Sequence, residues 1–157
     1  LRPVMIPGIL VELELRARSA SQLPFARVEL VESRGPWLTE PLPAAAIGWS
    51  CALTASVLPE RNPYPPLFQA LDALLNAICH APSARGWLAA MVVYETMLLR
   101  ELGYGGGKPD IKGDLPAQFE AFRQLHRPLG HYLLADAKSD VMAARVLLGE
   151  RLARMVR

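Results

Sequence analysis

The stretch SARGWLAAMVVYETMLLREL, Ser83 to Leu102, decides the fold class of this 157-residue sequence. Its large apolar side chains recur every three or four residues, which is the spacing of one face of an α-helix. Ser83 stands in the position of a helix N-cap, and Gly103 follows the stretch, where a left-handed residue commonly closes a helix. The stretch therefore predicts a long helix that packs through Trp87, Met91, Tyr94, Leu98 and Leu102.

Helical patterns continue on both sides of this stretch. Residues 41–59 are apolar on nearly every side, as in a core helix, and residues 64–82 carry prolines in the first turn and then a leucine stripe. Residues 115–136 predict a further helix, which Pro128 should kink or split because proline lacks the backbone N–H.

The last 19 residues, SDVMAARVLLGERLARMVR, predict a final helix capped by Ser139 or Asp140. Four arginines are expected off its apolar stripe: Arg145, Arg151, Arg154 and Arg157.

The N-terminal part has a different period. Residues 11–19 and 26–33 alternate apolar and charged side chains, which predicts two strands with one wet face each, joined by a turn at 19–24. Residues 1–8, LRPVMIPG, predict an edge strand broken by proline. Strands followed by helices predict an α+β fold and not an alternating α/β sheet.

Composition narrows the function classes only a little. The net charge is +2, made up of +1 over residues 1–35, −3 over 36–122 and +4 over 123–157. The basic C-terminal end fits phosphate binding and fits an ordinary solvated helix surface equally well. Cys51 and Cys79 form no Cys-x-x-Cys pair, so we expect reduced, buried cysteines in a cytosolic protein. The chain does not begin with Met, and we expect residues before Leu1.

No catalytic constellation is evident. His126 and His131 flank Pro128 at a spacing that does not place both on one face of a straight helix, and His80 stands apart from them. Cys51 has no base nearby in sequence. GYGGGK, residues 103–108, follows a helix, whereas a phosphate-binding glycine loop follows a strand and opens a helix. We therefore expect no enzyme and no cofactor.

Arginines of the predicted strands offer one binding surface. They alternate outward, as in an open β-barrel that presents a groove to a phosphate backbone. Glutamates are interleaved with them, so solvated strand faces explain the pattern at least as well. The arginines are Arg16, Arg18, Arg27 and Arg34, and the glutamates are Glu12, Glu14, Glu29 and Glu32.

The segment YETMLLRELGYG, Tyr94 to Gly105, resembles the helix that closes the helical domain of the bacterial recombination mediator RecO. Leu-Gly-Tyr-Gly is the specific part, and the order of the other elements is similar over most of the chain. The resemblance implies the C-terminal part of an OB-fold β-barrel at 1–35 and an α-helical domain at 36–157. It places the family's zinc-finger region, here reduced or missing, near 106–114.

The resemblance also implies a function. RecO-like proteins bind single- and double-stranded DNA, anneal strands, contact the C-terminal tail of single-stranded DNA-binding protein (SSB), and help RecR load RecA. This implies a non-catalytic DNA repair and recombination protein of the RecFOR pathway in the bacterial cytoplasm, associated with the nucleoid and with no membrane. Candidate phosphate contacts are then Arg2, Arg16, Arg18, Arg27, Arg34, Arg123, Arg127, Arg145, Arg151 and Arg154.

Two features depart from the family pattern. Many relatives place zinc-binding cysteines after Leu-Gly-Tyr-Gly, and GGKPDIKGDLP has none. Relatives often carry Arg before the aromatic residue of this helix, near the proposed pocket for the SSB tail, where this chain has Val93. We therefore expect either a weaker tail contact or a weak contact made by Arg85 or Arg100 instead. The alternative function is a helical protein-interaction module without nucleic-acid binding.

Overall fold

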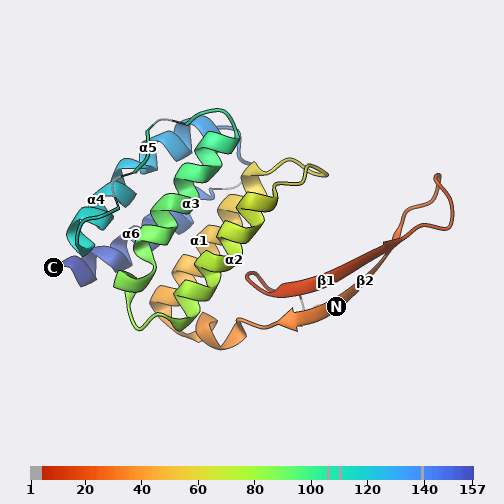
Figure 1. Cartoon of the computed structure of the whole chain (residues 1–157), viewed down its shortest axis with the longest axis horizontal. Helices are drawn as coiled ribbons and strands as arrows, with labels where there is room; N and C mark the ends of the chain where they lie inside the picture. The colour runs from red at the N-terminus through yellow and green to blue at the C-terminus, as the bar shows by residue number, and fades with distance from the viewer. Residues whose placement is uncertain (1–4, 106, 110, 139) are drawn as a thin grey trace.

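The computed structural model describes residues 5–105, 107–109, 111–138 and 140–157. The fold is α+β, with an antiparallel hairpin that extends from one side of a helical bundle (Figure 1). This confirms the predicted order of strands and then helices. The elements are β1 (Leu10–Arg16), β2 (Phe25–Glu32), η1 (Gly35–Thr39), α1 (Pro41–Val57), α2 (Pro65–His80), η2 (Ala84–Gly86), α3 (Leu88–Glu101), α4 (Leu115–Gln124), α5 (His126–Pro128), η3 (Leu129–Leu133) and α6 (Met142–Val156).

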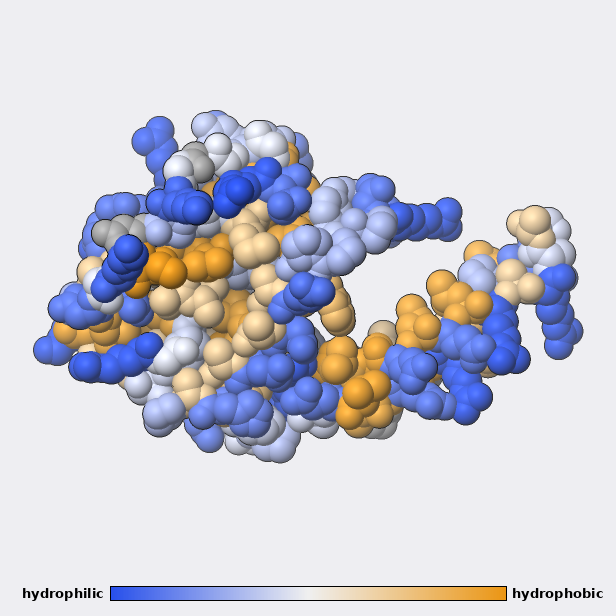
Figure 2. Space-filling view, viewed as in Figure 1, coloured by the Kyte–Doolittle hydropathy of each residue, from blue (hydrophilic) through white to orange (hydrophobic). Residues whose placement is uncertain are grey.

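The hairpin keeps the alternation that the sequence predicts. Leu13 pairs with Val28 and Glu14 pairs with Arg27, so one face is apolar and the other charged. Figure 2 shows this as orange along one side of the arm and blue along the other. The apolar face has no cover, because Leu13 is 56% exposed and Leu15 61% exposed.

The predicted edge strand at 1–8 is wrong for its described part. Residues 1–4 lie outside the described residues, and residues 5–8 form no strand but a turn at Pro7 and Gly8. Gly8 has a φ of +87°, and a Cβ there would lie 2.8 Å from Cγ2 of Ile47. The backbone at Gly8 therefore lies too close to α1 to leave room for a side chain. Its positive φ is also outside the range of a β-strand.

The helical bundle contains the core. α1 packs against α2 and α6, and α3 packs against α2 and α4. The apolar stripe predicted on the central helix faces this core, since Trp87, Met91, Tyr94 and Leu98 are all at most 2% exposed. None of the described helices is long and apolar enough to cross a membrane.

The end of α3 is closed by glycine, as predicted. Gly103 has a φ of +90°, and its N–H donates to the carbonyl of Arg100. The N–H of Tyr104 donates to the carbonyl of Leu99 at 2.7 Å. These bonds satisfy carbonyls that the helix end would leave open, and they fix where Tyr104 emerges.

Pro128 splits the next helix, also as predicted. α4 ends at Gln124, four residues before Pro128. Pro128 has no N–H to donate to the Gln124 carbonyl, and in a continuous helix its ring would clash with that carbonyl. The chain continues as a short turn and then as a π-helix, η3, in which the N–H of Leu134 donates to the carbonyl of Leu129. At the N-terminus of α6, Oδ1 of Asp140 accepts from the N–H of Ala143, while Ser139 lies outside the described residues.

Candidate functional site

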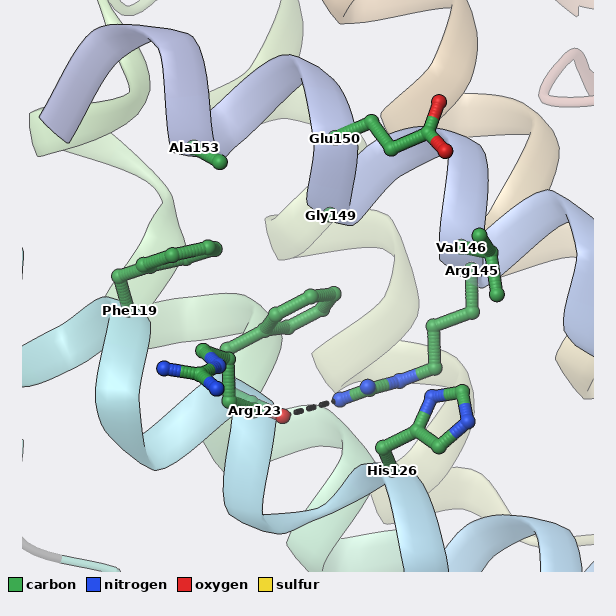
Figure 3. Close-up of a pocket in the computed structure, with 9 residues that line it drawn as sticks. Phe119, Arg123, His126, Arg145, Val146, Gly149, Glu150 and Ala153 are labelled. Atoms are coloured by element: carbon green, nitrogen blue, oxygen red, sulfur yellow. Dashed lines mark hydrogen bonds between the residues drawn. The ribbon is translucent and has the colours of Figure 1, made fainter. Parts of the chain in front are cut away.

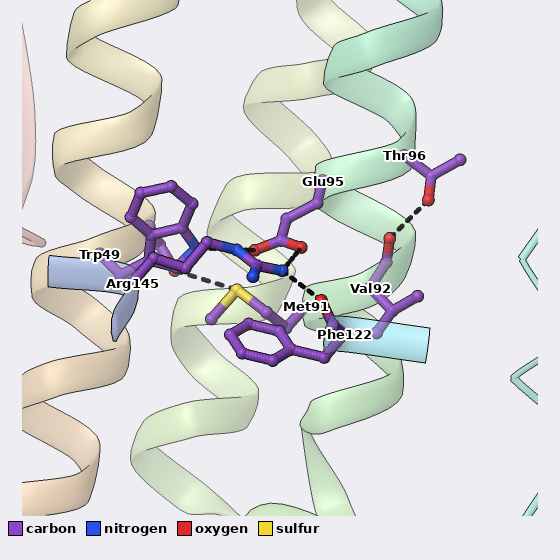
Figure 4. A network of polar contacts seen from close by, with 8 residues as sticks. Trp49, Met91, Val92, Glu95, Thr96, Phe122 and Arg145 are labelled. Atoms are coloured by element: carbon purple, nitrogen blue, oxygen red, sulfur yellow. Dashed lines mark hydrogen bonds and ion pairs between the residues drawn. The ribbon is translucent and has the colours of Figure 1, made fainter. Parts of the chain in front are cut away.

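A buried ion pair joins the helices at the centre of the bundle. Glu95 of α3 is fully buried, and Arg145 of α6 donates to both of its carboxylate oxygens at 3.1 and 2.8 Å. Nε1 of Trp49, from α1, donates to the same carboxylate at 2.7 Å. Arg145 also donates to the carbonyl of Phe122 in α4 and lies over its ring. Figure 4 shows how these residues from four helices meet at one point.

This geometry changes the role of Arg145. The sequence predicted an outward arginine that contacts DNA, but the side chain is only 2% exposed. Val141, Leu148 and Leu152 lie four residues before, three after and seven after it, so Arg145 is on the apolar stripe of α6. Burial raises the pKa of the Glu95 carboxyl, and the charge and hydrogen bonds of Arg145 act in the opposite direction. Arg145 is therefore a core group and not available to a phosphate.

Arg34 is the second predicted DNA contact that the structure buries. It is 1% exposed, and it donates to the carbonyl of Gly8 and to side-chain oxygens of Asp72 and Asn76 in α2. It also lies 3.5 Å from a carboxylate oxygen of Glu32. Arg34 therefore ties the base of the hairpin to the bundle, so we remove it and Arg145 from the candidate DNA contacts.

Two other hairpin arginines lie on the charged face, where carboxylates neutralise them. Arg16 pairs with Glu14 at 2.7 Å, and Arg27 pairs with Glu29 at 2.5 Å. Arg18, beyond the end of β1, is exposed and forms no ion pair with another described residue. The described part of the hairpin thus presents a mixed face and not a positive channel.

The predicted strip on the helical domain is more open. Arg127 and Arg154 are exposed and have no ion pair among the described residues, whereas Arg123 pairs with Glu120 at 3.2 Å. Arg151 is half-buried, and its Nε is buried without a hydrogen-bond partner. Arg2 lies outside the described residues.

A groove between α4 and α6 lies beside this strip. It encloses about 540 Å³, with Phe119 and Gly149 on opposite walls and Arg145 at its inner end. Figure 3 shows Arg123 and His126 along one side and Glu150 and Ala153 along the other. Burial, and then the charge of Arg145, lowers the pKa of His126, which favours the neutral imidazole at physiological pH.

A second groove, of about 570 Å³, lies between α3 and the loop at 107–112. Val93, Met97 and Ile111 supply apolar walls, and Arg100 and Lys108 lie at the groove with Glu101 as the opposing charge. Arg85 does not line this groove. It lies in η2, before the other end of α3, roughly 20 Å along the helix axis from Arg100. The structure thus separates the two arginines predicted for one peptide contact.

Metal ligands do not gather in the described part of the chain. No group of three or more His, Cys, Asp or Glu side chains is close enough there to hold a metal ion. Residues 103–114 contain neither Cys nor His, the ligands that structural zinc prefers. The loop therefore does not fit the zinc module that the resemblance places at this position.

Comparison with known proteins identifies the bundle. Residues 40–106 match the family model described as Recombination protein O C terminal. Proteins described as DNA repair protein RecO are similar over about two thirds of the chain. The one from Phenylobacterium zucineum is 38% identical over 105 residues, 66% of this chain and 42% of the relative. The one from Rhodospirillum centenum is 39% identical over 106 residues, 67% of this chain and 41% of the relative.

The matched part thus spans about two fifths of the length of these relatives. No solved structure matches. Sequence reasoning missed Glu95 and its partners. The signal was present, because a glutamate between Tyr94 and Leu98 lies on the buried side of a strongly apolar helix, opposite an arginine on another apolar stripe.

Proposed function

Because the chain belongs to the RecO family of DNA repair and recombination proteins, we propose that it is a DNA-binding mediator that catalyses no bond chemistry. It binds single- and double-stranded DNA, anneals complementary strands, and helps RecR load RecA on strands covered by SSB in the bacterial cytoplasm at the nucleoid. The family match over α1, α2 and α3 carries this proposal.

Exposed cations support the DNA-binding part. Arg127 and Arg154 are exposed and unpaired within the described residues, and Arg18 is likewise exposed beyond β1. Such groups contact phosphates through charge and read no base, because binding releases condensed counterions. Buried Arg34 and Arg145 are not part of this surface. The helical strip is therefore the stronger candidate, and the hairpin contributes through Arg18.

The test is binding to a fluorescent single-stranded oligonucleotide at two salt concentrations. If about four arginines contact phosphates, the affinity should fall by a factor on the order of 50 between about 50 and 200 mM salt. The alternative protein-interaction module predicts little binding at either concentration, and that result would refute the proposal.

Charge-reversal variants locate the surface. Arg127→Glu and Arg154→Glu should weaken binding and leave the melting temperature unchanged, since both side chains are exposed. The pair Arg16→Glu and Arg18→Glu tests the hairpin in the same way. Arg61→Glu is the matched control, an exposed arginine in the loop between α1 and α2. Equal effects of all these variants would mean a diffuse charge effect without a located surface.

The groove between α3 and the 107–112 loop supports a contact with the SSB tail. An acidic C-terminal peptide with an apolar end residue would place its apolar group against Val93 and Met97 and its carboxylates near Arg100 and Lys108. A labelled peptide of the SSB C-terminus should lose affinity for the Arg100→Glu variant and keep it for Arg85→Glu. The reverse order of effects would move the contact to the N-terminal end of α3.

The hairpin supports a division into a partial OB-fold at 1–35 and a helical domain at 36–157. A two-stranded sheet is marginal by itself, and the apolar face formed by Leu13, Leu15 and Leu30 is exposed. Further strands of a β-barrel would cover this face. Amide exchange on a longer form of the protein should show strong protection across β1 and β2, and fast exchange there would contradict the barrel.

A further inference from the structure

A pair of stacked tyrosines is not used by any site described so far. Tyr104, just after α3, and Tyr132, in η3, have ring centroids 5.3 Å apart and planes inclined by 17°. Each is about half exposed, at 50% and 49%, so the pair lies at the surface. Two large rings held flat against each other in solvent form a preorganised aromatic platform.

Both rings are held by backbone features that are unusual for a surface loop. The glycine-closed end of α3 fixes Tyr104 through its N–H bond to Leu99. Tyr132 belongs to the π-helix, a form that is rare and frequently occurs at functional sites. His131 packs edge-on against Tyr132, with centroids 4.8 Å apart. The contacts hold both rings in place, so the two side chains would lose little further conformational freedom when a ligand stacks on them.

A groove of about 510 Å³ opens beside the platform, lined by both tyrosines and by Pro109, Leu125 and Pro128 among others. Of the described lining residues Glu120 is the only charged one, and Arg123 neutralises it. The groove can thus receive a flat, uncharged group of small-molecule size.

Basic residues are the sequence neighbours of groove-lining residues in two segments of the chain. Arg127 and His131 are one helical turn apart and directly precede the groove residues Pro128 and Tyr132. Lys108 precedes the groove residue Pro109 and is exposed, but its side chain lines the second groove, beside α3. Neither Lys108 nor Arg127 has an ion pair among the described residues. An aromatic platform next to an exposed arginine matches a strand whose bases stack and whose phosphates lie to the side.

We propose that Tyr104 and Tyr132 form a stacking site for an unpaired nucleobase, with Arg127 contacting an adjacent phosphate. The site rests on the proposed DNA-binding function and deepens it, because it selects single strands over duplex. In a duplex the bases are stacked on one another, so their faces are closed to a protein ring. Stacking on tyrosine tolerates any base, which suits a protein that acts without sequence preference.

The experiment compares two labelled strands of equal length and equal phosphate number, oligothymidine and a fully abasic strand. The chain should prefer oligothymidine. Tyr104→Ala and Tyr132→Ala should each lower its affinity for oligothymidine about fivefold or more and leave the affinity for the abasic strand unchanged. Tyr104→Phe keeps the ring and should bind like the parent. Phe68→Ala is the matched control, because Phe68 is an exposed aromatic residue on α2.

The outcomes separate this site from the wider proposal. If the chain binds oligothymidine but the tyrosine variants bind it equally well, the stacking site is refuted and the DNA-binding function stands. If the chain binds neither strand, both are refuted. If a proline-rich peptide binds and Tyr104→Ala abolishes only that binding, the groove belongs to a protein partner, and the nucleobase site is refuted. Melting curves confirm that each variant is folded.

Discussion

Replacing Arg145 by methionine should destabilise the bundle and should not act as the loss of a surface cation. In the parent chain the Glu95 carboxylate accepts two hydrogen bonds from Arg145 and one from Trp49. Arg145→Met retains most of the side-chain length but leaves a fully buried carboxylate with a single donor. The contact of the guanidinium with the ring and carbonyl of Phe122 is also lost.

The expected cost follows from the burial of the partner that remains. Removing one member of a buried ion pair typically costs about 3–5 kcal/mol, because an uncompensated charge is left in the core. For a chain of this length, the melting temperature should fall by roughly 10 °C. Glu95→Gln should destabilise for the complementary reason. The double variant Glu95→Gln/Arg145→Met removes both charges, so it should be less destabilised than the sum of the single variants by about 2 kcal/mol.

The pH dependence identifies the buried carboxylate as the cause. Burial already raises the pKa of Glu95, and Arg145 opposes that rise, so Arg145→Met should raise the pKa further. A carboxyl whose pKa is higher in the folded than in the unfolded state lowers the free energy of unfolding at pH values where it is ionised. This loss disappears as the pH falls and the carboxyl becomes protonated in the folded state. The stability difference between variant and parent should therefore shrink as the pH is lowered from about 7.5 to about 5.

Urea unfolding followed by circular dichroism at several pH values measures both quantities. The reasoning is refuted if Arg145→Met unfolds within about 0.5 kcal/mol of the parent at neutral pH, the range of an ordinary surface substitution. A variant that loses DNA affinity but not stability would instead return Arg145 to the binding surface. Arg127→Met, which removes an exposed arginine, is the control.

Three other substitutions test particular parts of the fold. Arg34→Met should cost about 2 kcal/mol and expose the hairpin to limited proteolysis, because bonds to Gly8 and α2 are lost, whereas the exposed Arg27→Met should do neither. Gly103→Ala should lower the free energy of unfolding by about 1 kcal/mol, because φ at Gly103 is +90°. If Gly107→Ala lowers it by the same amount, left-handed strain at Gly103 is not the cause. Burial raises the pKa of Tyr94 to about 12, so the folded state resists ionisation of this side chain, and the free energy of unfolding should fall as pH rises above about 10. In alkaline unfolding curves Tyr94→Phe should show a weaker decline than the parent, and an equal decline would refute this.

Much of the fold was predictable because the deciding signals are local. Alternation in β1 and β2, proline in the first turns of α1 and α2, and the apolar spacing of α3 each depend on residues a few positions apart. The ends of α3 and α4 were predictable for the same reason. Gly103 and Pro128 act on the backbone of their own turn, wherever the rest of the chain lies.

The candidate site was less predictable because arginine serves two purposes. An arginine on a strand or helix has the same sequence neighbours whether it faces water or a buried carboxylate. Arg34 finds its partners in α2, and Arg145 finds Glu95 fifty residues away. Neither pairing has a local pattern, so both arginines were expected at the surface with Arg127 and Arg154.

The sequence alone determined the class of the fold, the position of most helices, and the family, since these depend on the order of short patterns and on the Leu-Gly-Tyr-Gly segment. Only the tertiary structure decided which arginines are exposed, which form core ion pairs, and which aromatic rings meet at the surface. The physical reason is that charge neutralisation and ring stacking act between side chains that folding brings together from distant elements.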